Sequence, residues 1–166
     1  MSKVKQIGYD VGGGQLPVSR HLTIIDHMPL AEARTWWGKG DAFRYVRKDV
    51  RAAGWATGLE ESAQYVLCSR LIRYLETDTG MVPTQTQNPE AYHRFADEIS
   101  KLVSPGGVLV LFDFTHLVME VVKRFRLYAE VCNWWIVCPP ELITRGEGHW
   151  PAESRVVFVR NPLWEE

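Results

Sequence analysis

The sequence predicts a three-layer α/β fold with a mostly parallel, doubly wound sheet. Short β-rich runs alternate along the chain with segments of helical apolar spacing, and this alternation is typical of strands joined by right-handed crossovers. The run Val108–Phe112 is continuously apolar, as expected for a strand covered on both faces. With 166 residues, 46% hydrophobic and 23% charged, the chain is expected to form a single domain, residues 1–166.

Four short runs in the first half predict strands, because they are rich in β-branched residues and bounded by glycine or polar residues. They are Val4–Val11, Leu22–Ile25, Phe43–Val46 and Ala63–Ser69. Only a short helix over Leu16–His21 has room between the first two strands. Pro29–Trp37 predicts a helix with proline at its first position. Leu71–Leu75 is expected to follow the fourth strand as a helix or turn.

The second half begins with a polar segment, Glu76–Asn88, that is expected to form a long exposed loop. Asn88, Pro89 and Glu90 then predict the start of a helix, with a cap, a proline at the first position and an acid in the first turn. Pro105–Gly107 ends this helix and leads into the strand Val108–Phe112.

Thr115 is expected to cap the next helix, in which apolar residues line one side. Two late strands, Trp134–Cys138 and Val156–Val159, complete the sheet, separated by a Pro/Gly-rich excursion over Pro139–Pro151. A tryptophan pair in a late strand predicts one buried ring, Trp134 or Trp135, and one half-exposed ring.

Charge and cysteine content exclude several classes of partner. The net charge of −1 indicates no general attraction to nucleic acid or to an anionic membrane. Nucleic acid is kept as a candidate partner, although the net charge does not favour it. The three cysteines form no CxxC pair and predict neither a disulfide framework nor a metal site. The three thiols are expected to be reduced and mostly buried. Because no apolar run reaches signal or membrane-span length, a cytoplasmic location without membrane association is expected. Exposed tryptophans and small size favour a homodimer.

The candidate binding residues follow the predicted strands, because ligands of open parallel sheets bind outside the carboxyl ends of the strands. They are Asp10 with Gly12–Gly14, Asp26, Asp49, Ser69 and Asp113. A glycine turn allows close approach of a ligand to the backbone, and an acid at the end of the second strand can accept both hydroxyls of a ribose. Together they favour a nucleoside-binding site. The alternative is a plain tight turn beside a surface acid, with no ligand.

These residues resemble the class I S-adenosylmethionine-dependent methyltransferases. Tyr9–Gly14, YDVGGG, is similar to their first motif, an acid, any residue, glycine, any residue, glycine. Asp26 and Asp49 stand where the family has its acids after the second and third strands. Gln64–Leu75 resembles the fourth strand and its turn, and Ala91–Phe112, ending SPGGVLVLF, resembles the following helix, turn and strand. The match departs from the family after Gly14, where Gln15-Leu16-Pro17 shortens the first helix.

The resemblance implies a Rossmann-like sheet with an antiparallel last strand and S-adenosylmethionine as cofactor. It implies that Asp10 or the N–H groups of Gly12, Gly13 and Gly14 contact the methionine end, that Asp26 binds the ribose, and that Asp49 lies near the adenine amine. The acceptor is unknown and could be a small molecule, a protein or nucleic acid. Candidates for catalytic and substrate contacts are Ser69 and Arg70 after the fourth strand and His116 after the fifth, with the 76–88 loop as a lid.

Three alternatives stay open. A DNA or RNA amino-methyltransferase is loosely indicated by the tail from Cys132 to Asn161, but its D/N/S-P-P-Y/F/W motif is absent where the chain reads CSRL. A non-catalytic methyltransferase-fold binding or assembly module is favoured by the shortened first helix. A nicotinamide dinucleotide enzyme ranks last, because GGGQLP lacks the final glycine of G-x-G-x-x-G.

Overall fold

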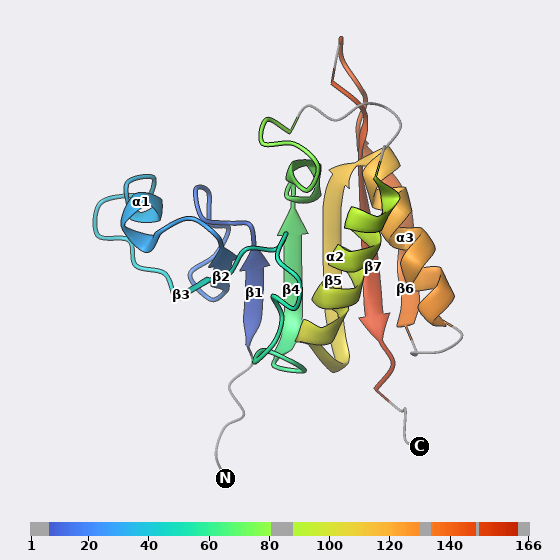
Figure 1. The fold of residues 1–166 in the computed structure, drawn as a ribbon, viewed down its shortest axis with the longest axis horizontal. Helices are drawn as coiled ribbons and strands as arrows, with labels where there is room; N and C mark the ends of the chain where they lie inside the picture. The colour runs from blue at the N-terminus through green and yellow to red at the C-terminus, as the bar shows by residue number, and fades with distance from the viewer. Residues whose placement is uncertain (1–6, 81–87, 130–133, 149, 163–166) are drawn as a thin grey trace.

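The computed structural model describes residues 7–80, 88–129, 134–148 and 150–162. Seven strands form one sheet in the order β3-β2-β1-β4-β5-β7-β6 (Figure 1). The strands are β1 (Gly8–Val11), β2 (Thr23–Asp26), β3 (Tyr45–Arg47), β4 (Ala63–Ser69), β5 (Val103–Phe114), β6 (Trp134–Thr144) and β7 (Glu153–Arg160). The helices are α1 (Leu30–Arg34), the 3-10 turn η1 (Ile72–Tyr74), α2 (Pro89–Leu102) and α3 (Thr115–Ala129).

The first five strands run parallel, and β7 runs antiparallel to both β5 and β6. The predicted mostly parallel sheet with an antiparallel last strand is therefore confirmed. Strand order reverses direction at β1, since β2 and β3 lie to one side of it and β4 to the other. This switch point places the carboxyl ends of β1, β2 and β4 next to one another, where open α/β sheets bind ligands.

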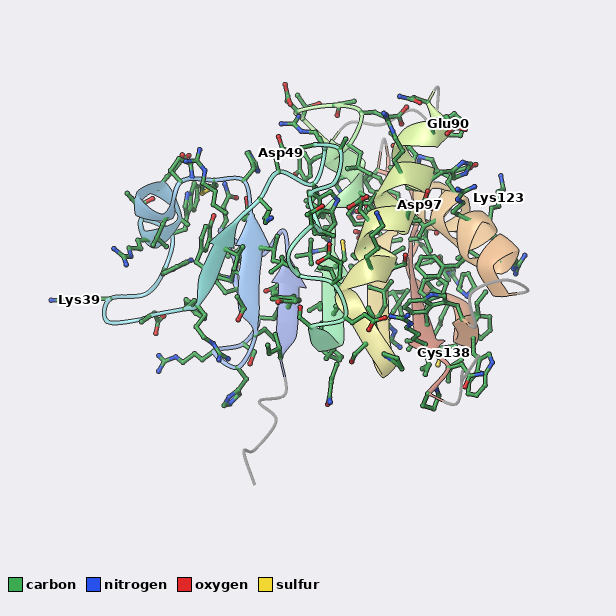
Figure 2. All side chains as sticks on the ribbon, turned by 60° about the horizontal axis from the view of Figure 1, so that its bottom comes forward. Lys39, Asp49, Glu90, Asp97, Lys123 and Cys138 are labelled. Carbon is green, nitrogen blue, oxygen red and sulfur yellow. The ribbon has the colours of Figure 1, made fainter. Side chains whose placement is uncertain are left out.

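Helices α2 and α3 lie side by side over one face of the sheet (Figure 1). Their apolar sides and the inward-facing residues of the strands form the buried core, whose largest members include Tyr92, Phe95, Phe125 and Phe158. Polar side chains such as Asp97 and Lys123 lie on the outer side of this helical layer (Figure 2). The helix predicted from Asn88–Glu90 thus forms as expected, although the Asn88 side chain makes no capping hydrogen bond.

The second face has a much smaller helical layer than the sequence predicted. The right-handed crossover from β2 to β3 assigns α1 to this side, but α1 spans only Leu30–Arg34 instead of Pro29–Trp37. The short helix predicted over Leu16–His21 is wrong: this segment forms bends and turns. The segment has only six residues, too few for a helix to be stable by itself, and Val18 N–H within it donates to the Asp10 side chain of β1.

The expected Pro/Gly-rich excursion over Pro139–Pro151 is also wrong in its first part. Strand β6 continues through both prolines to Thr144, and a bridge between Glu147 and Trp150 extends the β6–β7 hairpin beyond the sheet. Pro139 and Pro140 are tolerated because β6 is the edge strand and its pairing with β7 is irregular between Cys138 and Glu141, and strand prolines are confined to edges and bulges.

Smaller expectations have mixed outcomes. Trp134 is buried and Trp135 is half exposed, as predicted for the pair. Thr115 begins α3, but its hydroxyl contacts Ala152 and Ser154 of the neighbouring hairpin instead of capping the helix. Cys68 is buried, whereas Cys138 is exposed, contrary to the expectation of mostly buried thiols. Cys132 and most of the expected 76–88 loop lie outside the described residues.

Candidate functional site at the carboxyl edge of the sheet

The glycine turn after β1 lies directly against two carboxylates. A Cβ on Gly13 would stand 2.3 Å from Oδ2 of Asp10, and a Cβ on Gly14 would stand 2.6 Å from Oδ2 of Asp26. Gly12 adopts a φ of 87°, a conformation that other residues rarely take. Each glycine is therefore explained by a local requirement, either close approach to an acid or a left-handed turn.

Hydrogen bonds connect this turn to the ends of β1 and β2. Gly14 N–H donates to Oδ2 of Asp26 at 2.9 Å, and Met28 N–H donates to Oδ1 of the same side chain at 3.1 Å. Val18 N–H donates to Oδ2 of Asp10 at 3.1 Å. From beyond α1, the indole N–H of Trp37 donates to Gly14 O at 2.8 Å. The glycine turn and Asp26, which the sequence predicted as two parts of one site, lie in contact.

Burial changes the acidity of this cluster. Asp10 is 3% exposed, and its burial together with the nearby charge of Asp26 raises its pKa to about 6, although the hydrogen bond from Val18 acts in the opposite direction. Burial and the same Asp26 charge raise the pKa of Tyr45 to about 12, and the Tyr45 hydroxyl donates to Met28 O. The imidazole Nδ1 of His27 lies 3.1 Å from Oδ1 of Asp26.

Asp49 lies near this cluster but makes no direct contact with it in the described residues. The backbone places it there, because Lys48 N–H donates to Asp26 O at 2.9 Å. The Asp49 carboxylate is turned toward its own loop, where it accepts the backbone N–H of Arg51 at 2.9 Å. Figure 2 shows it on the segment that follows β3. A half-exposed acid in this position has free acceptor capacity for a ligand amine.

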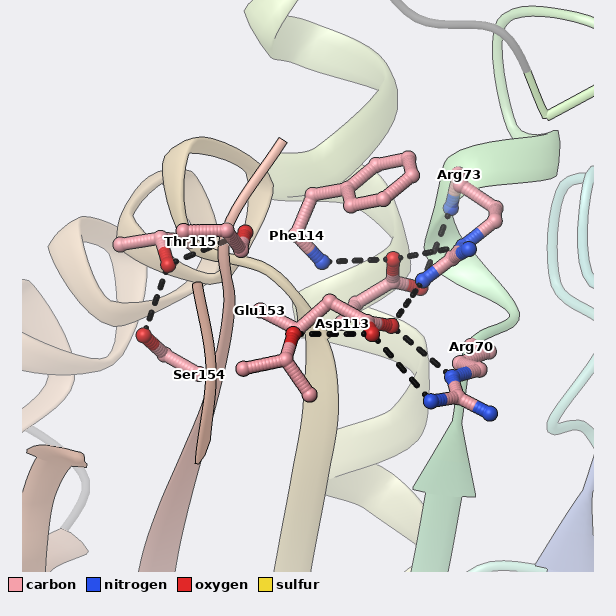
Figure 3. A network of polar contacts seen from close by, with 9 residues as sticks. Arg70, Arg73, Asp113, Phe114, Thr115, Glu153 and Ser154 are labelled. Atoms are coloured by element: carbon pink, nitrogen blue, oxygen red, sulfur yellow. Dashed lines mark hydrogen bonds and ion pairs between the residues drawn. The ribbon is translucent and has the colours of Figure 1, made fainter. Parts of the chain in front are cut away.

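A second polar cluster occupies the carboxyl ends of β4 and β5 (Figure 3). Arg73 bridges two carboxylates: its Nε donates to Asp113 at 2.9 Å, and its Nη2 donates to Glu153 at 2.6 Å. Arg70 holds the same Glu153 through Nε at 2.8 Å and Nη2 at 3.2 Å. The Thr144 hydroxyl, at the end of β6, donates to Oε1 of Glu153 at 3.1 Å. The cluster thus joins η1, β5 and the β6–β7 hairpin.

The two carboxylates of this cluster differ in their surroundings. Burial raises the pKa of Asp113, which is fully buried, even though Arg73 and two backbone N–H groups stabilise its charged form. Partial burial would also raise the pKa of Glu153, but hydrogen bonds from Arg70 and Arg73 outweigh it and lower that pKa below its ordinary value. Arg70 is the accessible member, since 55% of its side chain is exposed.

The structure brings together some of the predicted catalytic residues and separates others. Ser69 is exposed at the end of β4, in register with Phe112. Arg70 follows with a φ of 55° and lies over the Phe112 ring at 5.1 Å. His116 is the second residue of α3 and stacks on Phe114, with ring centroids 6.0 Å apart. No described contact joins His116 to Ser69 or Arg70.

Sequence reasoning missed Arg73 and Glu153. Arg73 carried a usable signal, because it lies three residues after Arg70 on a segment expected to form a turn. Glu153 gave no such signal, because it lies 80 residues from Arg73 in the sequence and stands before the predicted strand Val156–Val159.

A cavity of about 470 Å³ lies beside this edge and not over it. It is lined by residues 50–55, Leu75 and the outer side of α2, including Arg94. Neither the glycine turn nor Asp26 lines it. The cavity adjoins Asp49 through Val50 but is a separate feature of the described surface.

Comparison with known proteins relates the fold to one class. No family model matches the sequence, and no curated protein does. A SAM-dependent methyltransferase from Methanosarcina mazei matches 96% of this chain and 94% of its own, at 13% identity and a TM-score of 0.59. The N-methyltransferase NodS from Bradyrhizobium japonicum, in complex with S-adenosyl-L-homocysteine, matches 93% of this chain and 78% of its own, at 16% identity and 0.56.

An O-methyltransferase family protein from Burkholderia thailandensis gives a TM-score of 0.61 at 15% identity, over 97% of this chain and 53% of its own. Because these methyltransferase structures superpose on more than 90% of this chain, the chain has their Rossmann-like fold, with the mostly parallel sheet described above. The neighbours act on different kinds of acceptor atom, so the comparison selects none. Among the residues that the structure describes, no helix has the length and apolar character that a bilayer crossing requires.

Proposed function

We propose that this single-domain chain is an S-adenosylmethionine-dependent methyltransferase whose cofactor binds where the glycine turn meets Asp26. The observation that carries the proposal is the contact between Gly14 N–H and the Asp26 carboxylate at the switch point of a methyltransferase-type sheet. Ligands of such sheets bind at this point. The neighbour with bound S-adenosyl-L-homocysteine supports the same ligand class.

The residues present fit this cofactor in their chemistry. A carboxylate has about four acceptor positions. Asp26 uses two of them for Gly14 and Met28, and His27 Nδ1 lies 3.1 Å from the oxygen that accepts from Met28, so Asp26 retains capacity for a ribose hydroxyl. Asp49 supplies an acceptor for the adenine amine. The turn of Gly12–Gly14 supplies a backbone without side chains for the methionine end, next to Asp10.

Access to Asp26 depends on the segment after the turn. Asp26 is 9% exposed and Asp10 is 3% exposed, because residues 12–22 cover them without forming a helix. Cofactor binding therefore requires residues 15–22 to move away from the two acids while Gly12–Gly14 keep their place. The cofactor supplies an activated methyl group on a sulfonium, so the chain has to align the acceptor with it and exclude water.

Binding is tested by titration calorimetry with S-adenosylmethionine and, for comparison, with NAD. We expect the former to bind and Asp26→Asn to weaken binding by about 1.5–3 kcal/mol, the worth of a hydrogen bond to a charged group. Asp97→Asn is the matched control, since Asp97 lies on α2 and pairs with Arg124. Thermal melting of each variant separates lost binding from lost folding. Absence of binding by the folded wild-type chain would contradict the proposal.

Methyl transfer requires a second measurement. Transfer of label from the cofactor to components of a cell extract would establish activity and give the acceptor class, whether small molecule, protein or nucleic acid. The expected dependence on Asp26 is the same as in binding. For residues near the acceptor, we propose Ser69, Arg70 and His116, of which Ser69 and Arg70 lie at the carboxyl end of β4.

A second candidate, a methyltransferase-fold module that binds without transferring, is favoured by one observation. The polar groups at the ends of β4 and β5 are engaged with each other, because Arg70 and Arg73 both hold Glu153. A chain that binds the cofactor but labels nothing in the extract would support this candidate over the enzyme.

A further inference from the structure

The glycine turn after β1 is held in place by hydrogen bonds from three directions. Gly12 N–H donates to the β2 backbone at 2.7 Å, and Gly14 N–H donates to the Asp26 carboxylate at 2.9 Å. The third bond comes from the connection between α1 and β3, where the indole N–H of Trp37 donates to Gly14 O at 2.8 Å. All three bonds end at Gly12 or Gly14, so the turn is fixed independently of the residues that follow it.

Residues 15–22, which we call the strap, continue from this turn and bury little apolar surface. None of them belongs to the buried core, and the side chains of Leu16 and Val18 point into solvent, since these residues are 84% and 63% exposed. Opening of a segment costs little free energy when it breaks few buried apolar contacts. The strap can therefore leave the site without disturbing the core.

Polar contacts with other segments hold the strap where it lies. Val18 N–H donates to the Asp10 carboxylate at 3.1 Å. An exposed ion pair joins Arg20 of the strap to Asp41 of the α1–β3 connection, and the Arg44 guanidinium donates to the strap backbone at 3.1 Å. Exposed ion pairs stabilise little, so these contacts close the strap weakly.

The contacts of the turn and the strap replace the first hydrogen bond of a helix. In an α-helix, Gly14 O would accept the N–H of Val18, four residues later. Here each group bonds a side chain from another element instead: Gly14 O accepts from Trp37, and Val18 N–H donates to Asp10. Trp37 thus takes the place of a following helix in fixing the end of the turn.

Trp37 is itself fixed by neighbouring rings. Its centroid lies 4.9 Å from that of Phe43, edge to face, and 6.3 Å from that of Tyr45. The Tyr45 hydroxyl donates to Met28 O, and Met28 N–H donates to the Asp26 carboxylate. The rings that support Trp37 are therefore connected to the acid that is proposed to bind the ribose.

We propose that Trp37 is a positioning residue of the cofactor site, which holds the glycine turn in place while the strap opens to admit the ligand. This inference rests on the proposed function, because the ligand is S-adenosylmethionine. The two parts act on affinity in opposite directions. A turn that is already ordered saves its ordering cost on binding, whereas a mostly closed strap lowers the apparent affinity in proportion to the open fraction.

The role of Trp37 is tested by titration calorimetry with S-adenosylmethionine. Trp37→Phe keeps an aromatic ring beside Phe43 but removes the N–H that binds Gly14. It should weaken binding about 3- to 10-fold, the worth of one hydrogen bond. Trp36→Phe is the matched control, because Trp36 is the adjacent tryptophan and is 56% exposed. It should bind like the wild type.

The role of the strap is tested by the opposite sign. Arg20→Gln breaks the ion pair with Asp41 and should strengthen binding about 2- to 5-fold, since the open fraction rises by the worth of an exposed pair. Lys39→Gln is the control for the lost positive charge, because Lys39 lies on the same connection and points away from the sheet (Figure 2). It should leave affinity unchanged.

Hydrogen exchange measured by NMR tests the same arrangement without the cofactor. Relative to its intrinsic rate, Val18 N–H should exchange faster than Gly12 N–H and Gly14 N–H in the wild-type chain. Arg20→Gln should accelerate Val18 and leave both glycines unchanged. Trp37→Phe should accelerate Gly14, whereas a general loss of stability would accelerate the strands of the sheet as well.

The outcomes separate this proposal from the proposed function. If the folded wild-type chain does not bind S-adenosylmethionine, the proposed function fails, and the exchange rates alone decide on the turn and the strap. Equal exchange of Val18 and Gly14 overturns the proposal. So does a Trp37→Phe variant that binds like the wild type, or an Arg20→Gln variant that binds more weakly. Thermal melting identifies a variant that does not fold, and Arg20→Gln, an exposed change, keeps the test valid if Trp37→Phe does not.

Discussion

At one side of the carboxyl edge, Asp10 and Asp26 are buried mainly against backbone N–H groups, whereas at the other side Asp113 and Glu153 are buried against the guanidinium groups of Arg73 and Arg70. The first arrangement leaves negative charge uncompensated, and the pKa of Asp10 rises to about 6. The second pairs two acids with two guanidinium groups, which lower the pKa of Glu153, although burial still raises the pKa of Asp113. A site kept for a ligand can carry such an imbalance, while a structural cluster is expected to be neutralised.

Removing the buried cation should have the largest effect. Arg73→Met keeps most of the apolar volume but leaves Asp113, which is fully buried, without its ion-pair partner. Breaking a buried pair by removing one partner costs about 3–5 kcal/mol. We expect a loss of this size in the free energy of unfolding, measured by urea denaturation at pH 7.

The control for this change is Arg124→Met. Arg124 also pairs with an acid, Asp97, but both side chains are about one-third exposed, and such pairs contribute about 0–1 kcal/mol. Equal losses in the free energy of unfolding for the two variants would show that the ion pairs of Figure 3 stabilise the fold no more than a partly exposed pair does.

Neutralising Asp10 should increase the free energy of unfolding at neutral pH, whereas removing Arg73 should decrease it. Because the folded-state pKa is about 6 against a reference of 3.8, the folded chain binds the proton more tightly than the unfolded chain between these values. Its stability therefore falls as pH rises from about 4 to 6, by about 3 kcal/mol in all. Asp10→Asn removes this dependence and should be more stable than wild type at pH 7, measured by denaturant unfolding across pH.

Glu153→Gln provides the contrasting profile. The folded-state pKa of Glu153 lies below its reference of 4.5, so its charge stabilises the fold above that value and the benefit disappears as pH falls through the folded pKa. The Gln variant should thus be less stable than wild type at pH 7 and approach it in acid. Parallel profiles for the two variants would contradict the proposed difference between the clusters.

The sequence predicted the first cluster better than the second for a physical reason. Adjacent parallel strands end at the same edge, so Asp10, Asp26 and the glycine turn had to meet once β1 and β2 were recognised. Glu153 reaches Arg73 only because the hairpin begins its return strand earlier than the Val156–Val159 run indicated. Apolar periodicity locates the centre of a strand and not its ends, where this contact lies.

The covering of the sheet was predicted equally unevenly. Helices α2 and α3 follow from strong apolar periodicity over long segments. The layer on the other face was expected from the general architecture of α/β sheets, but the connection from Gly12 to Leu22 is too short for a full helix between turns and contains Pro17. This shortening leaves the face of the sheet opposite α2 and α3 with little helical cover. No local pattern in the strands predicted it.

The smallest expected effect separates backbone strain from charge at Arg70. Its φ of 55° is unfavourable for any residue except glycine, at a cost of about 1 kcal/mol or more. Its half-exposed pair with Glu153 contributes only about 0–1 kcal/mol. Arg70→Gly removes both and should change the free energy of unfolding by less than about 1 kcal/mol.

Arg70→Ala is the informative partner of this variant, since it loses the same ion pair but keeps a Cβ in the left-handed conformation. The glycine variant should be the more stable of the two by about 1 kcal/mol, the usual cost of this conformation. A loss of several kcal/mol in both would place Arg70 among the buried members of the cluster, where only Arg73 is expected. Equal stabilities would show instead that the backbone at the end of β4 relaxes when the guanidinium no longer holds Glu153, so that the strained turn depends on the ion pair.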